Sequence, residues 1–174
     1  MSDNDNTQII ENWKPITGYE TLYMVSDLGN VYSIRNKRNL LPKNGTNEYI
    51  HVALCHGKKK YVNIHRLVAR EFLGLKDGDK LDVNHIDGDH KNNKLSNLEL
   101  VSRRENCSHY TLRTKKTVGV SFCKPRQCWR AFIRINRKQI YLGGFPTKEE
   151  AQLAYLNAME KHNIKDRYAQ GVLK

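Results

Sequence analysis

One polar stretch in the middle of the chain combines a histidine with amides and carboxylates. It covers residues 83–89, VNHIDGD, and Asn97 and Asn106 follow His85 by 12 and 21 residues. Histidine suits proton transfer near neutral pH, because its unperturbed pKa is about 6.5. Amide and carboxylate oxygens are the ligands that Mg²⁺ and Mn²⁺ prefer. The stretch therefore contains the residue types that hydrolysis of a phosphodiester needs, a general base and ligands for a divalent cation.

The spacing resembles the His-Asn-Asn (HNH) nuclease motif, in which two short strands and a helix fold around one divalent metal ion. The resemblance implies a DNA endonuclease with His85 as general base and Asn97 bracing the loop so that the imidazole points at the attacking water. It implies Asn84 and Asn106 as ligands of one Mg²⁺ or Mn²⁺ ion. Many relatives have aspartate before the histidine. Because a neutral amide binds a hard cation less strongly, metal binding here is expected to depend on the DNA phosphate.

Two other interpretations of the same stretch exist. The Asp-Gly-Asp run and its neighbouring asparagines are common turn chemistry when taken alone. A calcium loop fits less well, because its fifth position is Lys91 and its twelfth is Leu98, where glutamate is needed. The full spacing from Asn84 to Asn106 favours the nuclease over both.

Length and composition are compatible with a soluble nuclease. The 174 residues, 39% hydrophobic, can form one medium domain or two to three small modules. No run approaches the roughly 18 apolar residues of a membrane span, and the N-terminus is acidic rather than signal-like. We expect a cytoplasmic protein, in the bacterial host if phage-encoded, with no membrane partner. The four cysteines lack paired spacing and are expected to be reduced thiols rather than zinc ligands.

Positive charge is concentrated toward the C-terminus. The net charge is +12, and residues 111–174 carry 14 basic and 4 acidic side chains, whereas residues 61–110 carry 8 of each. Residues 111–146 contain nine basic side chains and no acidic one. Such a stripe predicts binding to a polyanion.

The N-terminal part predicts a β-hairpin. Residues 22–26 and 31–34 are β-rich runs around a Gly-Asn turn. Together with Trp13 and the Gly-Tyr-Glu that follows it, they resemble the small β-rich module that precedes the nuclease core in many phage homing endonucleases, which is thought to contact DNA or brace the core. A plain hydrophobic hairpin that packs on the core through Trp13, Tyr23 and Val25 is an equally good interpretation.

The central part alternates between strand and helix signals. Strands are expected at 49–54 and 60–64, and a helix at 65–73, where His65 is a cap, a packing residue or a phosphate contact. Strands at 81–83 and 98–101 precede a second helix with Ser102 as N-cap, which places Asn106 one turn in. Arg103 and Arg104 are then candidates for holding the DNA backbone.

The C-terminal part predicts three strands, at 118–122, 129–135 and 139–145, and a helix opened by a capping box of Thr147 and Glu150. Residues 117–163 are similar to the DNA-binding domain of plant ethylene-response (APETALA-type) factors. If Trp129, Ala131, Ile133 and Ile135 face the helix, alternation places arginines and aromatic residues on the outer face, as a β-sheet that enters the major groove requires. The candidate DNA contacts are Arg126, Arg130, Arg134, Lys138 and Tyr141.

Several contact arginines of the plant relatives correspond here to Val118, Ser121 and Cys123. The resemblance therefore implies DNA binding by this domain more than it implies the sequence preference of the plant proteins. The alternative is that these arginines are ordinary solvated side chains with no role in binding.

The sequence thus predicts an α+β chain of three modules whose central ββα-metal core is an endonuclease. The expected domains are a disordered N-terminus at 1–11, a β-rich module at 12–60, the HNH core at 61–110, a basic linker at 111–116 and the ethylene-response-factor-like domain with its tail at 117–174. The expected partner is double-stranded DNA, without an obligate protein partner, and the expected state is a monomer or weak dimer. A phage homing endonuclease is implied, and the alternatives are a non-catalytic DNA-binding regulator and an RNA-binding ribosomal-type protein.

Overall fold

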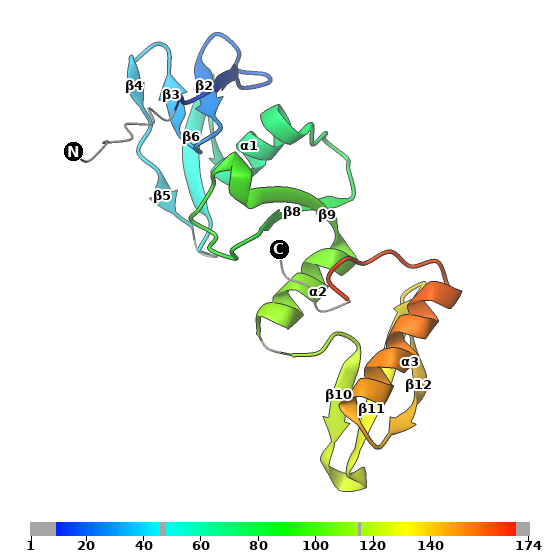
Figure 1. The fold of residues 1–174 in the computed structure, drawn as a ribbon. Coiled ribbons are helices and arrows are strands. Elements are labelled where there is room, and N and C mark those ends of the chain that lie inside the picture. The colour runs from blue at the N-terminus through cyan, green and yellow to red at the C-terminus, as the bar shows by residue number, and fades with distance from the viewer. Residues whose placement is uncertain (1–9, 46–47, 115, 170–174) are drawn as a thin grey trace, which may run out of the picture. The chain divides into compact units, whose positions relative to one another are not determined.

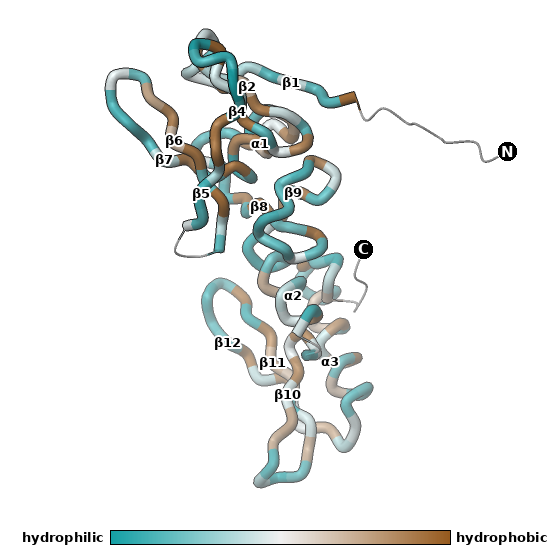
Figure 2. Tube along the Cα trace, turned by 90° about the vertical axis from the view of Figure 1, so that its left-hand side faces the viewer, coloured by the Kyte–Doolittle hydropathy of each residue, from teal (hydrophilic) through white to brown (hydrophobic). Residues whose placement is uncertain are grey.

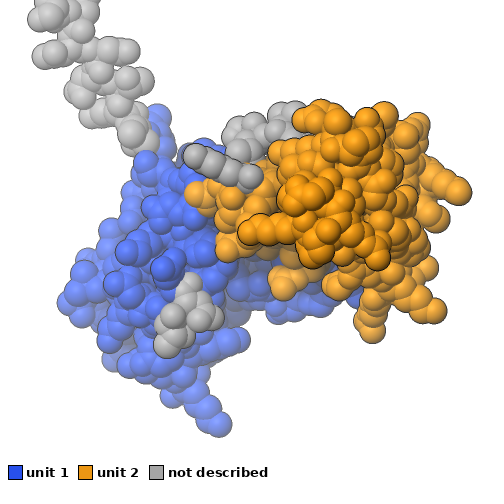
Figure 3. Space-filling view, turned by 90° about the horizontal axis from the view of Figure 1, so that it is seen from below, with its two compact units in different colours: residues 1–101 blue, residues 102–174 orange. Residues whose placement is uncertain are grey.

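The computed structural model describes residues 10–45, 48–114 and 116–169. The chain is a mixed α/β protein that divides into two compact units, residues 1–101 and residues 102–174, coloured blue and orange in Figure 3. Residues 1–9, most of the N-terminus expected to be disordered, lie outside the described residues. None of the described helices is long and apolar enough to cross a membrane.

The first unit contains nine strands and one long helix among its described residues (Figure 1). A four-stranded sheet has the order β1-β2-β3-β4, a three-stranded sheet the order β5-β6-β7, and β8 pairs with β9. The strands are β1 (Trp13–Pro15), β2 (Tyr23–Ser26), β3 (Val31–Ser33), β4 (Arg38–Asn39), β5 (Lys43–Asn44), β6 (Ile50–His56), β7 (Lys58–Asn63), β8 (Leu81–His85) and β9 (Leu98–Ser102), and the helix is α1 (Ile64–Leu73).

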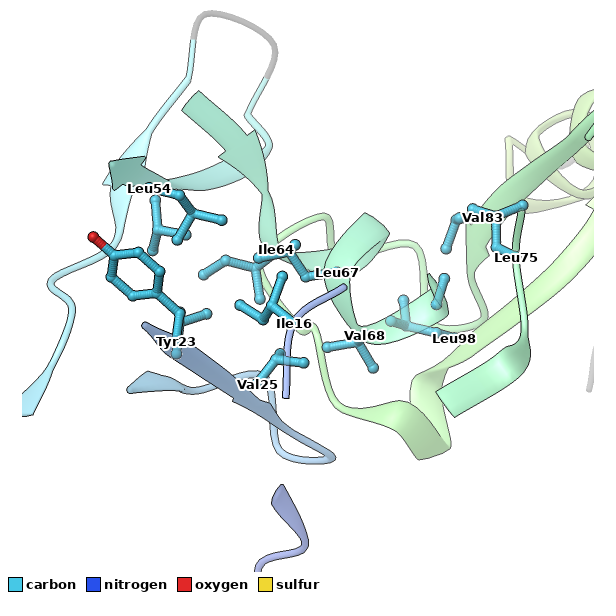
Figure 4. Packing of buried hydrophobic residues seen from close by; sticks show 13 residues of the cluster. Ile16, Tyr23, Val25, Leu54, Ile64, Leu67, Val68, Leu75, Val83 and Leu98 are labelled. Carbon is cyan, nitrogen blue, oxygen red and sulfur yellow. The ribbon is translucent and has the colours of Figure 1, made fainter. Parts of the chain in front are cut away.

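One hydrophobic core serves both the N-terminal hairpin and the strands that carry the polar motif. Leu67 and Val68 of α1 are 2% and 0% exposed. They pack in the same cluster as Val25 of β2, and as Val83 of β8 and Leu98 of β9 (Figure 4). The modules expected at 12–60 and 61–110 are therefore not packed separately. As far as residue 101, where the first unit ends, they share one hydrophobic core.

The two strands of the β6–β7 hairpin lie close to the ranges predicted from the sequence, 49–54 and 60–64. Val52 and Leu54 of β6 are buried, whereas β7 opens with three exposed lysines, so β6 is brown and β7 largely teal in Figure 2. The amphipathic pattern decides which strand faces the core.

The second unit packs two helices and a three-stranded antiparallel sheet of order β10-β11-β12. The elements are α2 (Arg103–Arg113), β10 (Val120–Cys123), a 3₁₀ turn at Lys124–Arg126, β11 (Cys128–Ile135), β12 (Lys138–Phe145) and α3 (Lys148–Lys161). The small-residue face of α3 lies on the sheet, with Ala151 at 0% and Tyr155 at 3% exposure. A Cβ at Gly119 would lie 2.2 Å from the Tyr155 ring, so only glycine permits this approach.

Both predicted helix starts are present. The Ser102 hydroxyl accepts from Glu105 N–H, and the Glu105 carboxylate accepts from Ser102 N–H, which makes a complete capping box for α2. At α3 the Thr147 hydroxyl accepts from Glu150 N–H. The sequence predicted Ser102 as the cap but did not predict its reciprocal bond.

Candidate active site

Asn97 ties together the loop between β8 and β9. Its Oδ1 accepts from Asp87 N–H at 3.0 Å, and its Nδ2 donates to Asp87 Oδ1 and to Asn92 O, each at 2.9 Å. The side chain is 9% exposed. One amide thus fixes both ends of the turn that follows His85, and the orienting role that the motif resemblance implies for Asn97 stays a prediction.

The carboxylate at the centre of this loop stays ionised. Partial burial raises the pKa of Asp87, but hydrogen bonds from Asn92 and Asn97 outweigh that effect and hold the pKa below its ordinary value. The polar-turn interpretation is therefore correct as a description of the loop, and it is compatible with a catalytic site because the turn begins directly after His85.

We expect Asn97→Asp to damage this loop nearly as much as Asn97→Ala. The aspartate keeps the acceptor for Asp87 N–H but places oxygen against Asp87 Oδ1 and Asn92 O, so it loses two part-buried hydrogen bonds, each worth about 0.5–1.5 kcal/mol. Urea unfolding measures the loss. Asn39→Asp, on the exposed strand β4, introduces the same charge and should leave stability unchanged. If Asn97→Asp is as stable as the control variant Asn39→Asp, Asn97 does not hold the loop.

His85 lies at the end of β8 and is 3% exposed. Burial lowers its pKa, so the imidazole is neutral at neutral pH. Its Nε2 lies 3.3 Å from Asn93 Oδ1. A buried, neutral imidazole can accept a proton from water, as a general base must.

Three aromatic side chains surround this imidazole. Tyr49 stacks on His90 with 4.4 Å between ring centroids and lies 4.7 Å from His65, while the His65 and His85 centroids are 5.2 Å apart. Burial, followed by the charge of His85, lowers the pKa of His65 to about 3. His65 is therefore a neutral packing residue against the proposed base rather than a cationic phosphate contact.

Asn84 is 5% exposed, and its Nδ2 donates to Glu99 Oε1 at 2.8 Å across the β8–β9 pair. This bond orients the amide, whose other polar atom is the oxygen that a hard cation takes. Among the described residues no group of three or more His, Cys, Asp or Glu side chains is arranged to hold a metal ion. A donor set of amide oxygens completed by DNA phosphate fits Mg²⁺ or Mn²⁺ better than zinc.

The last residue of the motif, Asn106, lies on α2 in the second unit, together with the candidate DNA contacts Arg103 and Arg104. Asn106 is half-buried and Arg103 exposed. The Arg104 guanidinium donates to the backbone oxygen of Arg134 and to Tyr155 Oη, so it joins α2 to the C-terminal sheet and helix. Because these bonds hold it in place, Arg104 is a structural group as well as a candidate for DNA contact.

The candidate DNA contacts of the C-terminal sheet are mostly exposed. Arg126, Arg134 and Lys138 are exposed, and Tyr141 is 51% exposed and pairs with Phe132 across the strands. The Arg130 guanidinium lies 5.5 Å from the centroid of the Phe132 ring. Of the residues expected on the opposite face, Ala131 and Ile133 are 0% and 1% exposed, whereas Trp129 and Ile135 are half-buried.

The sequence did not identify Tyr49, His90 or Asn93 as site residues. His90 and Asn93 lie within the motif loop, where their histidine and amide side chains were a usable signal. Tyr49 comes from the start of the β6 segment, and nothing in its sequence context indicates that it reaches His85.

Comparison with known proteins identifies the class. Residues 62–107 match the HNH endonuclease family model, and residues 11–55 match the NUMOD4 motif. The chain is 41% identical over 124 residues to DNA endonuclease I-HmuI of Bacillus phage SP01, covering 66% of this chain and 68% of that protein. It is 31% identical over 116 residues to H-N-H endonuclease F-TflII of Escherichia phage T5, covering 66% and 60%.

The solved structure of the HNH homing endonuclease I-HmuI, described as showing DNA binding and cleavage, matches with a TM-score of 0.55 and 28% identity over 90% of this chain and 94% of that one. The chain therefore belongs to the family of phage HNH homing endonucleases, whose members cleave DNA.

Proposed function

We propose that the chain hydrolyses phosphodiester bonds in double-stranded DNA at a chosen site, nicking one strand or cutting both, as a monomer or weak dimer. The observation that carries the proposal is the buried, neutral imidazole of His85, held within a match to the HNH model.

In this mechanism His85 takes the proton from a water molecule whose oxygen attacks phosphorus, while the bond from phosphorus to the leaving 3′ oxygen breaks. Asn97 holds the loop so that the imidazole keeps its orientation. Asn84 and Asn106 supply amide oxygens to Mg²⁺ or Mn²⁺. When bound, the ion neutralises the charge that develops on the leaving oxygen.

We further propose that the second unit binds DNA through the outer face of its sheet, as the likeness to ethylene-response-factor domains implies. The proposed contacts are Arg130, Arg134 and Tyr141 on that face, with Arg126 from the 3₁₀ turn and Lys138 from the start of β12. Arg103 and Arg104 are proposed to contact the DNA backbone. The support is the charge of the face and its exposed tyrosine.

Plasmid cleavage tests the proposal. A supercoiled plasmid that carries the insertion locus of the gene should relax or linearise in Mg²⁺ and remain intact in EDTA. DNA binding without cleavage under every divalent metal would favour the non-catalytic regulator instead.

The metal assignment gives a further prediction. Asn84→Asp alone places two carboxylates 2.8 Å apart, because Glu99 Oε1 now accepts from Asn84 Nδ2. We expect lower stability in EDTA but a lower Mg²⁺ requirement for cleavage, since a carboxylate attracts a hard cation more strongly.

The double variant Asn84→Asp, Glu99→Gln separates the two effects. The glutamine can donate to the new aspartate, so stability in EDTA should return. An Mg²⁺ titration that is identical in wild type, single and double variants would show that position 84 is not a ligand.

A further inference from the structure

Asn93 belongs to no part of the His-Asn-Asn motif, yet it is 6% exposed and its side chain faces the proposed base. Its Nδ2 donates to the backbone oxygen of Lys91 at 3.1 Å, and its Oδ1 lies 3.3 Å from His85 Nε2. The carbonyl oxygen of Lys91 can only accept. The amide orientation is therefore fixed, with Oδ1 toward His85.

This orientation determines the tautomer of the imidazole. An amide oxygen accepts and does not donate, so His85 Nε2 must carry the hydrogen. In the neutral ring the other nitrogen, Nδ1, then holds the lone pair that can take a proton from water. With the opposite tautomer, Nε2 and Asn93 Oδ1 would be two acceptors in contact, and Nδ1 would be unable to act as a base.

We propose that Asn93 is a positioning residue that fixes His85 in the Nε2–H tautomer, and that the β2–β3 turn of the N-terminal module holds Asn93 in place. The proposal rests on the proposed role of His85 as general base.

The turn touches Asn93 through Gly29. Gly29 has φ +83°, and a Cβ built there would lie 2.9 Å from Asn93 Cβ and 3.0 Å from Asn93 O. In addition, Leu95 N–H donates to Asp27 O at 2.7 Å, so the same turn also binds the chain two residues after Asn93. The N-terminal module thereby acts on the base through backbone contacts, whatever its contribution to DNA binding.

The first experiment measures the tautomer directly. In ¹⁵N-labelled protein without DNA or metal, the two nitrogens of a neutral imidazole give well separated ¹⁵N shifts, and long-range ¹H–¹⁵N correlations assign which one is protonated. We expect the Nε2–H form of His85 in wild type. We expect loss of that preference in Asn93→Leu, which has a similar volume but no acceptor.

Cleavage should follow the tautomer. We expect kcat of Asn93→Leu to fall about 10- to 100-fold, the usual loss when the partner that orients a functional histidine is removed, with unchanged affinity for DNA. An Nδ1–H tautomer in wild type, or an unchanged tautomer in Asn93→Leu, would overturn the proposal. Because the tautomer is measured without substrate, this result is independent of whether the proposed nuclease activity is correct.

The second experiment tests the turn with matched glycines. Gly29→Ala and Gly18→Ala both place alanine at a positive φ, +83° and +80°, but a Cβ at Gly18 meets nothing within 4 Å. Both variants carry the same backbone strain, and only Gly29→Ala displaces Asn93. We expect a weakened Nε2–H preference and slower cleavage in Gly29→Ala alone. Equal tautomers and equal kcat in the two variants would contradict the role of the turn.

Discussion

Replacing His85 with alanine is expected to lower the rate of cleavage by roughly 10²- to 10⁴-fold, the usual contribution of a general base. Affinity for DNA should change little, because a buried, neutral imidazole is a poor partner for phosphate. Single-turnover cleavage and a filter-binding titration on the same duplex measure the two quantities.

A second histidine provides the control. His56 is exposed at the end of β6, so His56→Ala removes an imidazole from the same unit without touching the loop that holds His85. Wild-type cleavage is expected for it. Cutting by purified His85→Ala at the wild-type rate would remove His85 from the mechanism.

Removing residues 117–174 is expected to abolish cleavage even at high protein concentration and low salt. The segment carries 11 basic and 4 acidic side chains. If it contributed only this charge, its removal would weaken DNA binding, and the core would still cut with poorer site choice. The packing of α2 changes that expectation. Its Ser108 hydroxyl donates to Asp166 Oδ2 at 2.6 Å, and the His109 and Tyr168 ring centroids are 4.7 Å apart.

These partners are all missing from the truncated chain. An isolated helix of the 11 residues of α2 is marginal in water, so Asn106 would no longer have a rigid support. Gel assays of cleavage against salt, run for full-length and truncated protein, test this expectation.

A full-length variant with fewer charges distinguishes the two roles of residues 117–174, which are to support α2 and to bind DNA. The exposed side chains Arg126, Arg134 and Lys138 can be changed to glutamine with the packing of α2 intact. For this variant we expect weaker binding and a flatter salt dependence, by about 0.9 in log-log slope for each phosphate that the variant no longer neutralises, with cleavage restored at low salt. If low salt restores cleavage by the truncated chain in the same way, α2 does not need residues 117–174 for its support.

Local signals were sufficient to predict several features of this protein. The strand pattern of residues 129–135 predicted that Ala131 and Ile133 are buried, and the residue types around position 102 predicted Ser102 as a helix cap. These features depend on neighbours close in sequence or on strict alternation. They can therefore be predicted from a single sequence without knowledge of the tertiary packing.

The environment of His85 could not be predicted in the same way. Tyr49 and Gly29 reach the motif loop from 36 and 56 residues before His85, and their contacts depend on how the sheets of the first unit pack. The association of α2 with residues 164–169 is equally hidden, because it is made by one serine, one aspartate and ring contacts that form no periodic pattern. The sequence placed the boundary between core and C-terminal domain at 111–116, whereas the compact units divide between residues 101 and 102.

That division constrains how such a nuclease can exchange its C-terminal domain. A recombination point in the basic linker at 111–116 would leave α2 against a foreign surface that lacks a partner for Ser108. A point just before Ser102 would keep α2 with its own packing, and it would transfer Asn106 together with the new DNA specificity. We therefore expect chimaeras joined between Val101 and Ser102 to keep the proposed metal ligand Asn106 together with the proposed DNA-binding sheet.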